Sequence, residues 1–173
     1  MPLPGCKISL GVDGDTAYIR LVGRAAAESA PSFEAAIQRL QSTGVRRFVL
    51  DLSEILLMDS GFSGMISGLV RDSGLSFALH RPPQRILDTF ADHGVIELVT
   101  QLPTAEAAGI PETGPAEELA PGTRAEVLRC CLEAHRNLMA LKPENVAKFQ
   151  MVEQYLAREL AKESGTPESG TVG

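Results

Sequence analysis

The residues best able to do chemistry lie in the segment LLMDSGFSGMISG, residues 56–68. An acid and a serine, Asp59 and Ser60, follow an apolar run there, and Gly61 and a second serine, Ser63, come shortly after them. A serine between a strand and a helix meets unpaired backbone N–H groups and the positive end of the helix dipole. Such a hydroxyl can cap the helix, attack a substrate or accept a phosphate, and these three roles predict different functions.

The first role is purely structural. Ser60 is a residue type that suits the N-cap of a helix, where its oxygen would accept a backbone N–H. Gly61 and Gly64 would let another segment pack closely against that helix. This interpretation predicts no function for the segment beyond folding.

The second role is that of a nucleophile. A G-x-S-x-G elbow exposes an activated serine at a strand-to-helix turn. Ser63 has Gly61 before it, but Met65 stands where the second glycine belongs. His80 and His93 are weak candidates for the base, and no acid partner is recognisable. No glycine-rich phosphate loop follows any strand either, so the sequence does not favour an enzyme.

The third role is that of a phosphate acceptor. A phosphate on an exposed serine brings about −1.5 to −2 charges to one spot of the surface. A helix N-terminus tolerates that charge, but a partner with an acidic or closely packed facing surface does not. Modification of Ser60 would therefore switch off the binding of such a partner.

The elements around this segment predict an α/β fold. Residues 6–10 and 16–23 are β-rich and flank GVDGD, which predicts a hairpin. Apolar runs predict further strands at 46–53, 75–80 and 95–100, whereas apolar residues at helical spacing predict helices within 31–44, 60–74 and 82–94. A short helix at 104–109 completes the set. A hairpin followed by crossovers predicts a mixed sheet of about five strands with packed helices.

The C-terminal part has a different pattern. Proline, glycine and glutamate dominate residues 110–122, which predicts a linker after a first domain at 1–109. A capping box at Thr123 and Glu126 and a proline at 143 predict a helical hairpin at 123–163. Its predicted apolar stripes consist of Val127, Leu128, Cys131, Leu132, Leu138 and Met139, then Val146, Phe149, Val152, Leu156 and Leu160. Residues 164–173 have nothing to bury and are expected to be disordered.

Composition excludes several classes of function. The 173 residues carry a formal net charge of −6 with no basic half, which argues against nucleic acid as a partner. No apolar run is long enough to span a membrane and the N-terminus lacks a secretory pattern, so we expect a cytoplasmic protein. Three cysteines make no disulfide framework, and we expect reduced thiols, no metal site and no cofactor.

The run FVLDLSEILLMDSG, residues 48–61, resembles the STAS family, which is named for sulfate transporters and anti-sigma factor antagonists. Gly23 at the end of the second strand and HRPPQRILDTFADHGV, residues 80–95, also follow the family's order. The resemblance covers about residues 6–108. Asp51 matches the acid of the preceding strand, where we expect it to end the strand and bond to nearby backbone.

The resemblance implies an anti-sigma factor antagonist without catalytic activity. In that branch the anti-sigma factor is a serine kinase that phosphorylates the serine after the aspartate, here Ser60 beside Asp59, and a serine phosphatase reverses the step. Phosphorylation would switch binding off. The implied partner-binding residues are Asp59, Ser60, Gly61, Phe62, Ser63, Gly23 and Arg24. The alternative is a STAS scaffold or sensory subunit of a signalling complex that uses the fold without phosphorylation.

The C-terminal hairpin lies outside the resemblance. One interpretation is that it folds back on the core, and the other is that its apolar stripe forms a homodimer or docks a partner. Both stay open, because an exposed stripe of this length has to be covered by something.

Overall fold

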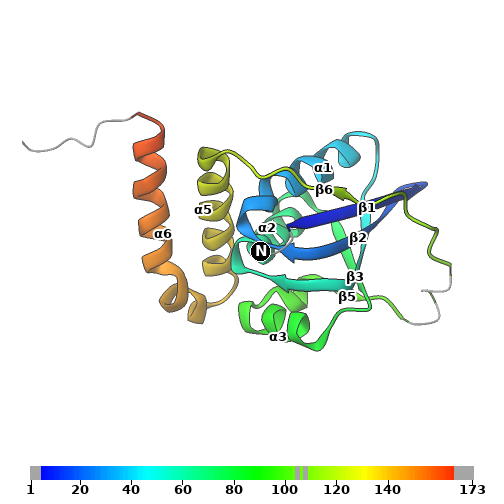
Figure 1. Cartoon of the computed structure of the whole chain (residues 1–173). Helices are drawn as coiled ribbons and strands as arrows, with labels where there is room; N and C mark the ends of the chain where they lie inside the picture. The colour runs from blue at the N-terminus through cyan, green and yellow to red at the C-terminus, as the bar shows by residue number, and fades with distance from the viewer. Residues whose placement is uncertain (1–4, 104–105, 107–108, 166–173) are drawn as a thin grey trace, which may run out of the picture.

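The structure is a computed structural model that describes residues 5–103, 106 and 109–165 (Figure 1). Its strands are β1 (Cys6–Asp13), β2 (Thr16–Ala25), β3 (Arg47–Met58), β4 (Ser76–His80), β5 (Thr100–Gln101) and β6 (Glu117–Glu118). Its helices are α1 (Ala30–Ser42), α2 (Ser60–Ser73), α3 (Gln84–His93), α5 (Arg124–Leu141) and α6 (Pro143–Glu163), with 3-10 turns η1 (Ala27–Ser29) and η2 (Val95–Leu98). The predicted α/β fold with a C-terminal helical hairpin is confirmed.

The described strands form one six-stranded mixed sheet in the order β5-β4-β3-β2-β1-β6. β1 and β2 pair antiparallel as the predicted hairpin, and Gly14 supplies the positive φ that its tight turn needs. β2, β3, β4 and β5 run parallel, because helical crossovers connect them. β6 adds an antiparallel edge beside β1. The sheet therefore has one strand more than the five we expected.

One face of the sheet carries the core. Alternate residues of β2 are buried, including Ala17, Ile19 and Leu21, and they pack with Phe33 of α1 and Phe62 of α2. β3 is buried on both faces over part of its length, as the short apolar run without alternation predicted. The parallel strands β2 and β3 end at the same edge, so the loop after β3 that carries Asp59 lies beside the end of β2.

Several boundaries differ from the prediction. β3 does not stop near residue 53 but continues to Met58, so Asp51 lies within the strand and does not end it. β2 likewise continues past Gly23 to Ala25, with a register shift between Gly23 and Arg24 that the positive φ of this glycine accommodates. Most of the apolar run predicted as a strand at 95–100 forms η2, and only its last residue pairs in β5. Short apolar runs do not distinguish these states.

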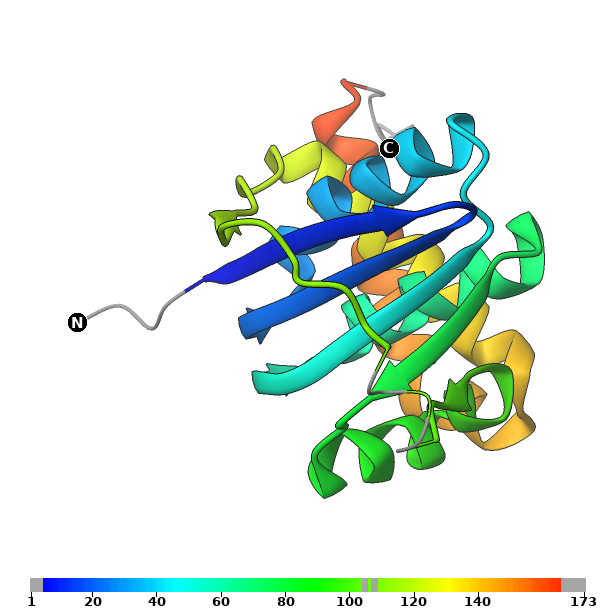
Figure 2. The ribbon, with the colours of Figure 1, turned by 90° about the vertical axis from the view of Figure 1, so that its right-hand side faces the viewer.

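Residues 110–122, predicted as a linker, cross the face of the sheet opposite the helices, and we call them the strap (Figure 2). The buried hydroxyl of Ser9 on β1 donates to the strap at Gly114 O, and Gly114 N donates to Leu10 O. The strap then forms β6 and reaches α5, where Gly122 N donates to Glu28 O. It therefore carries the chain from one edge of the sheet to the other. Its role as a boundary between two domains stays a prediction.

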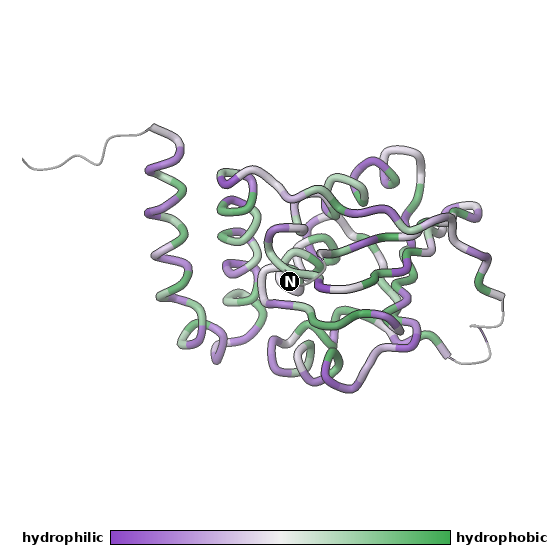
Figure 3. The backbone as a smooth tube through the Cα atoms, in the orientation of Figure 1, coloured by the Kyte–Doolittle hydropathy of each residue, from purple (hydrophilic) through white to green (hydrophobic). Residues whose placement is uncertain are grey.

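The C-terminal hairpin folds back on the core. α5 packs against α2 and α1, and α6 packs against α5 as an outer layer (Figure 1). Thr123 and Glu126 make the predicted capping box at the start of α5. Hydropathy alternates along both helices, as it does where only one face of a helix is buried (Figure 3). Two members of the predicted stripe on α6, Val146 and Val152, are nevertheless exposed.

Two predictions fall wholly or mainly outside the described residues. These are the short helix at 104–109, of which only residues 106 and 109 are described, and the disordered tail, of which only 164 and 165 are described.

Candidate functional site

The Asp59 side chain, not Ser60, caps α2. Its Oδ1 accepts a hydrogen bond from Phe62 N at 2.9 Å, and its Oδ2 accepts one from Ala27 N at 2.8 Å. Asp59 thus fixes both the start of the helix and the end of β2, whose Ala25 O accepts from Asp59 N. A carboxylate at this position also interacts favourably with the helix dipole. The structural interpretation of Ser60 as the cap was wrong by one residue.

Ser60 is the first helical residue of α2 and is partly exposed. Its hydroxyl lies 2.9 Å from Nε2 of His135, which α5 brings over it. Nδ1 of the same ring lies 2.6 Å from the carbonyl oxygen of Cys131. Because a carbonyl oxygen can only accept, Nδ1 carries the proton, and in the neutral ring Nε2 accepts from Ser60. The Ser60 hydroxyl therefore donates its proton toward the C-terminal hairpin.

The second serine has no access to the surface. Ser63 is 0% exposed, and its hydroxyl lies 2.9 Å from Nδ1 of His93 at the end of α3. Ser60 and Ser63 are thus paired with histidines from two different helices, whereas Ser67 donates to Gly64 O within α2. His93 was considered from the sequence as a base, whereas the partner of Ser60, His135, was missed. His135 lies on the buried side of α5, four residues after Cys131. No local sequence pattern identifies it as a partner of Ser60.

The two histidines meet around Phe149 of α6. The Phe149 ring contacts His93 with a centroid distance of 5.5 Å and His135 with one of 5.2 Å, both edge to face. Burial is the main reason why the pKa of His93 lies below its usual value, and the charges of Lys148, His135 and Lys142 lower it further against the opposing effect of Asp92. At neutral pH the uncharged His93 ring is therefore the favoured form.

The other predicted partner-binding residues occupy two environments. Gly61 and the side chain of Phe62 are buried in the first turn of α2, so neither contributes to an open surface. Gly23 and Arg24 lie at the end of β2, beside the residues of β3 that precede Asp59. The fold therefore brings both predicted groups to the same edge of the sheet, and their role in binding stays a prediction.

Asp51 lies on the opposite face of the sheet, in the wall of a cavity of about 460 Å³ under the strap. Its Oδ1 accepts from Ser53 N at 3.0 Å, which is the backbone contact we expected, and its Oδ2 pairs with Arg81 at 2.6 Å. Burial alone would raise the pKa of Asp51, but the Ser53 amide and the Arg81 guanidinium together hold it below its usual value. Asp51 is separate from Ser60, and its contacts join β3 to the residue that follows β4.

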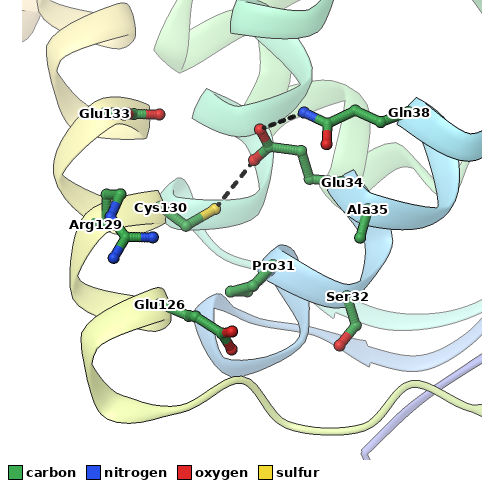
Figure 4. A pocket seen from close by; sticks show the side chains of 9 residues that line it. All are labelled: Pro31, Ser32, Glu34, Ala35, Gln38, Glu126, Arg129, Cys130 and Glu133. Atoms are coloured by element: carbon green, nitrogen blue, oxygen red, sulfur yellow. Dashed lines mark hydrogen bonds between the residues drawn. The ribbon is translucent and has the colours of Figure 1, made fainter.

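A second concave feature is a cavity of about 400 Å³ between α1 and α5 (Figure 4). Glu34 projects into it from α1, and the thiol of Cys130 on α5 donates to this carboxylate at 3.5 Å. Burial raises the pKa of Glu34, and it also raises the pKa of Cys130. Cys130 is thus buried although only Cys131 was predicted on the apolar stripe. The described residues contain no group of side chains that could hold a metal ion.

The two serine–histidine pairs lie away from the cavities described above. None of five well-formed pockets on the described residues is lined by Ser60, Ser63 or His135. His135 itself is only 4% exposed, so its ring offers little surface to a substrate. What the arrangement can do is hold α5 against α2 and control access to the Ser60 hydroxyl.

Comparison with protein-family models matches residues 8–100 to the family described as "Mlab, STAS domain". The matched segment contains most of β1, all of β2 to β4 and α1 to α3, and the Asp59–Ser60 pair, and it ends before the strap. This family is generally non-catalytic.

Two solved structures resemble the fold. One is the anti-sigma factor antagonist SpoIIAA in its unphosphorylated form, with 20% sequence identity, a TM-score of 0.50, and coverage of 61% of this chain and 99% of that chain. The other is the Bacillus cell fate determinant SpoIIAA in the phosphorylated form, with 20% identity, a TM-score of 0.47 and coverage of 58% and 96%. Among curated proteins none matches. No helix of the described residues has both the length and the apolar character that crossing a membrane requires.

Proposed function

The chain belongs to the STAS domain family, and from this premise we propose that it is an anti-sigma factor antagonist controlled at Ser60. In the active form it binds an anti-sigma factor that is a serine kinase. The kinase transfers the γ-phosphoryl group of ATP to Ser60 Oγ, the hydroxyl proton leaves, and ADP is released. The phosphorylated form no longer binds, and a serine phosphatase restores it.

The observation that carries this proposal is the difference in exposure between Ser60 and Ser63. Ser60 begins α2 directly after the Asp59 cap and keeps part of its surface exposed, whereas Ser63 is fully buried. A phosphate on Ser60 would lie beside the Asp59 carboxylate at the edge of the partner surface. The added negative charge and volume would separate a closely packed partner.

Incubation of the full chain with candidate serine kinases and ATP, followed by mapping of the modified peptide, tests the proposal. We expect phosphate on Ser60, its loss in Ser60→Ala, and its retention in the matched variant Ser63→Ala. Ser60→Asp should lose partner binding at least about tenfold, because it introduces charge at the same position. Normal partner binding by Ser60→Asp would contradict the mechanism.

A second candidate function is a constitutive STAS scaffold or sensory subunit that is never phosphorylated. The bond between Ser60 and His135 favours it, because the hydroxyl already has a partner within the chain. The intact mass of protein purified from its native cells, before and after phosphatase treatment, separates the two candidates. A mass that phosphatase lowers by one phosphate supports the antagonist, and an unchanged mass supports the scaffold.

The remaining partners belong to the same proposal. The absence of nucleic acid among the partners agrees with the net charge of −6, and a cytoplasmic location stays a prediction. A homodimer through the C-terminal helices also stays a prediction. The exposed side chains of Met151 (77%) and Tyr155 (53%) on α6 support it, and light scattering on the full chain decides it.

A further inference from the structure

The surface of α2 that carries Ser60 is already occupied by a helix of the same chain. His135 of α5 accepts from the Ser60 hydroxyl, and one turn further along α2 the backbone of α5 passes so close to Gly64 that a Cβ there would overlap the carbonyl oxygen of Ala134. Figure 1 shows α5 lying between α6 and the rest of the molecule. The glycine is therefore required by the close approach of the two helices.

Contacts at the far end of α5 hold it in this place. Asn145 at the start of α6 is 0% exposed, and its Nδ2 donates to Leu138 O of α5 and to His93 O at the end of α3. Lys148 pairs with Asp92 at 2.7 Å. Phe149 fills the space between the two histidines. We call α5 and α6 together the lid, since these contacts fasten them as one unit.

The docked lid and a modified Ser60 exclude each other. Although Ser60 keeps part of its surface exposed, its oxygen is hydrogen-bonded to the His135 ring at 2.9 Å. A kinase needs that oxygen in line with the phosphoryl group of its nucleotide, so this bond has to break first. A bound partner helix would need the same surface of α2, including the narrow space over Gly64. By linkage, anything that binds this surface weakens the docking of α5 by the same factor.

We propose that α5 is the resting occupant of a helix-binding surface on α2 and that the lid must undock before a kinase or a partner helix reaches Ser60. The identity of the kinase or partner rests on the proposed function, whereas the undocking of the lid does not. The surface fits a helix with a small residue opposite Gly64 and a hydrogen-bond acceptor opposite Ser60. The strap keeps the released lid attached, so that it competes with the partner at high local concentration.

Two glycine variants of the full chain test the lid. Gly64→Ala puts a methyl group against the backbone of Ala134, which cannot turn away. Gly68→Ala overlaps the side-chain amide of Asn137, which can turn away, and makes an ordinary contact with the Asp72 side chain. Both substitutions are on α2, and alanine favours a helix more than glycine does. Gly64→Ala should therefore loosen the lid, and Gly68→Ala is its matched control.

The chain supplies its own reporters of undocking. Cys130 is buried against α1 and α2, and burial raises the pKa of its neighbour Cys131 to about 11, so both react slowly with a maleimide while the lid is docked. Cys6 in β1 is buried in the core and reports global unfolding. Mass spectrometry of the labelled peptides gives the labelling rate of each of the three thiols. Ser60→Cys, alone and combined with Gly64→Ala, measures access to position 60 itself.

We expect Gly64→Ala to raise the labelling rate of Cys130 and of a thiol at position 60 by about tenfold or more, with Cys6 unchanged and Gly68→Ala near the wild-type rate. Phe149→Ala weakens the lid from α6 without touching α2 and should give the same pattern. Unchanged Cys130 labelling in both variants, or a parallel rise at Cys6 in both, would overturn the lid. The labelling experiment contains no kinase. A failure of phosphorylation in the kinase experiment would therefore contradict the proposed function without affecting the labelling result.

Discussion

At the scale of single residues, Asp59 has the capping role that one interpretation of the sequence gave to Ser60. Asp59 takes over the capping of α2 and also holds Ala27, and this leaves the Ser60 hydroxyl unused by the backbone of its own helix. The hydroxyl is then available for His135 in the docked form. The acid of the Asp-Ser pair is thus a structural requirement that frees the serine.

The first prediction follows from the two hydrogen bonds of Asp59. Asp59→Ala should lower the free energy of unfolding by about 2 kcal/mol, because the amides of Phe62 and Ala27 both lose a charged acceptor. Asp59→Asn keeps one carbonyl oxygen and should lose only about 1 kcal/mol. Urea unfolding of both variants measures the difference. Equal stability of Asp59→Ala and wild type would show that the cap contributes nothing.

At the scale of elements, the ends of α3, α5 and α6 meet around Phe149. His93 and Lys148 lie here on neighbouring helices, and the buried Asn145 amide joins all three. Among the described residues its Oδ1 has no hydrogen-bond partner, so the amide is only half satisfied. At this junction, protonation of His93 or separation of the three helices would lower the stability of the folded protein.

The second prediction concerns pH at this junction. The pKa of His93 is lowered in the folded state, chiefly by burial, so the unfolded chain binds the proton more tightly. The contribution of His93 is therefore neutral above its ordinary pKa of about 6.5, and stability is lost as the pH falls below that value toward the folded pKa. Urea midpoints at about pH 8 and about pH 5.5 should decrease on acidification, and His93→Gln should flatten that decrease. An identical pH dependence in the variant would exclude His93 as the cause.

At the scale of the whole molecule, the strap and the lid wrap the STAS core from opposite sides. The strap crosses the open face of the sheet and turns around the β1 edge, and the lid covers α2 on the other face (Figures 1 and 2). Because the strap leads directly into α5, its attachment to the sheet limits where the lid can go. Under the lid proposal, the C-terminal third of the chain would therefore control access to Ser60.

The third prediction tests the attachment of the strap. The Ser9 hydroxyl is 0% exposed, lies 2.6 Å from the Thr113 hydroxyl and donates to Gly114 O. Ser9→Ala leaves that carbonyl without its side-chain donor and should make the strap more susceptible to limited proteolysis by roughly tenfold, which corresponds to about 1.4 kcal/mol. Ser42→Ala, which removes an exposed hydroxyl at the end of α1, is the control. Equal cleavage rates would mean that other contacts hold the strap.

The sequence alone determined the elements whose signals are local. Glycines at 74 and 94 end α2 and α3 in left-handed conformations, Thr123 and Glu126 form their capping box, and the β-rich runs around GVDGD form the β1–β2 hairpin. These signals depend on backbone geometry within a few residues, so they can be recognised without the fold. The resemblance to the STAS family, which the family match confirmed, rested on the order of such elements.

Only the tertiary structure decided what surrounds Ser60. The pairing with His135 joins residues 75 positions apart, and it depends on how α5 docks on α2. The same holds for β6, whose two residues form a strand because β1 offers an open edge, and for residues 95–98, which turn as η2 where an apolar run suggested a strand. Such outcomes are set by which surfaces meet in space, and a local pattern carries no information about a partner that lies far away along the chain.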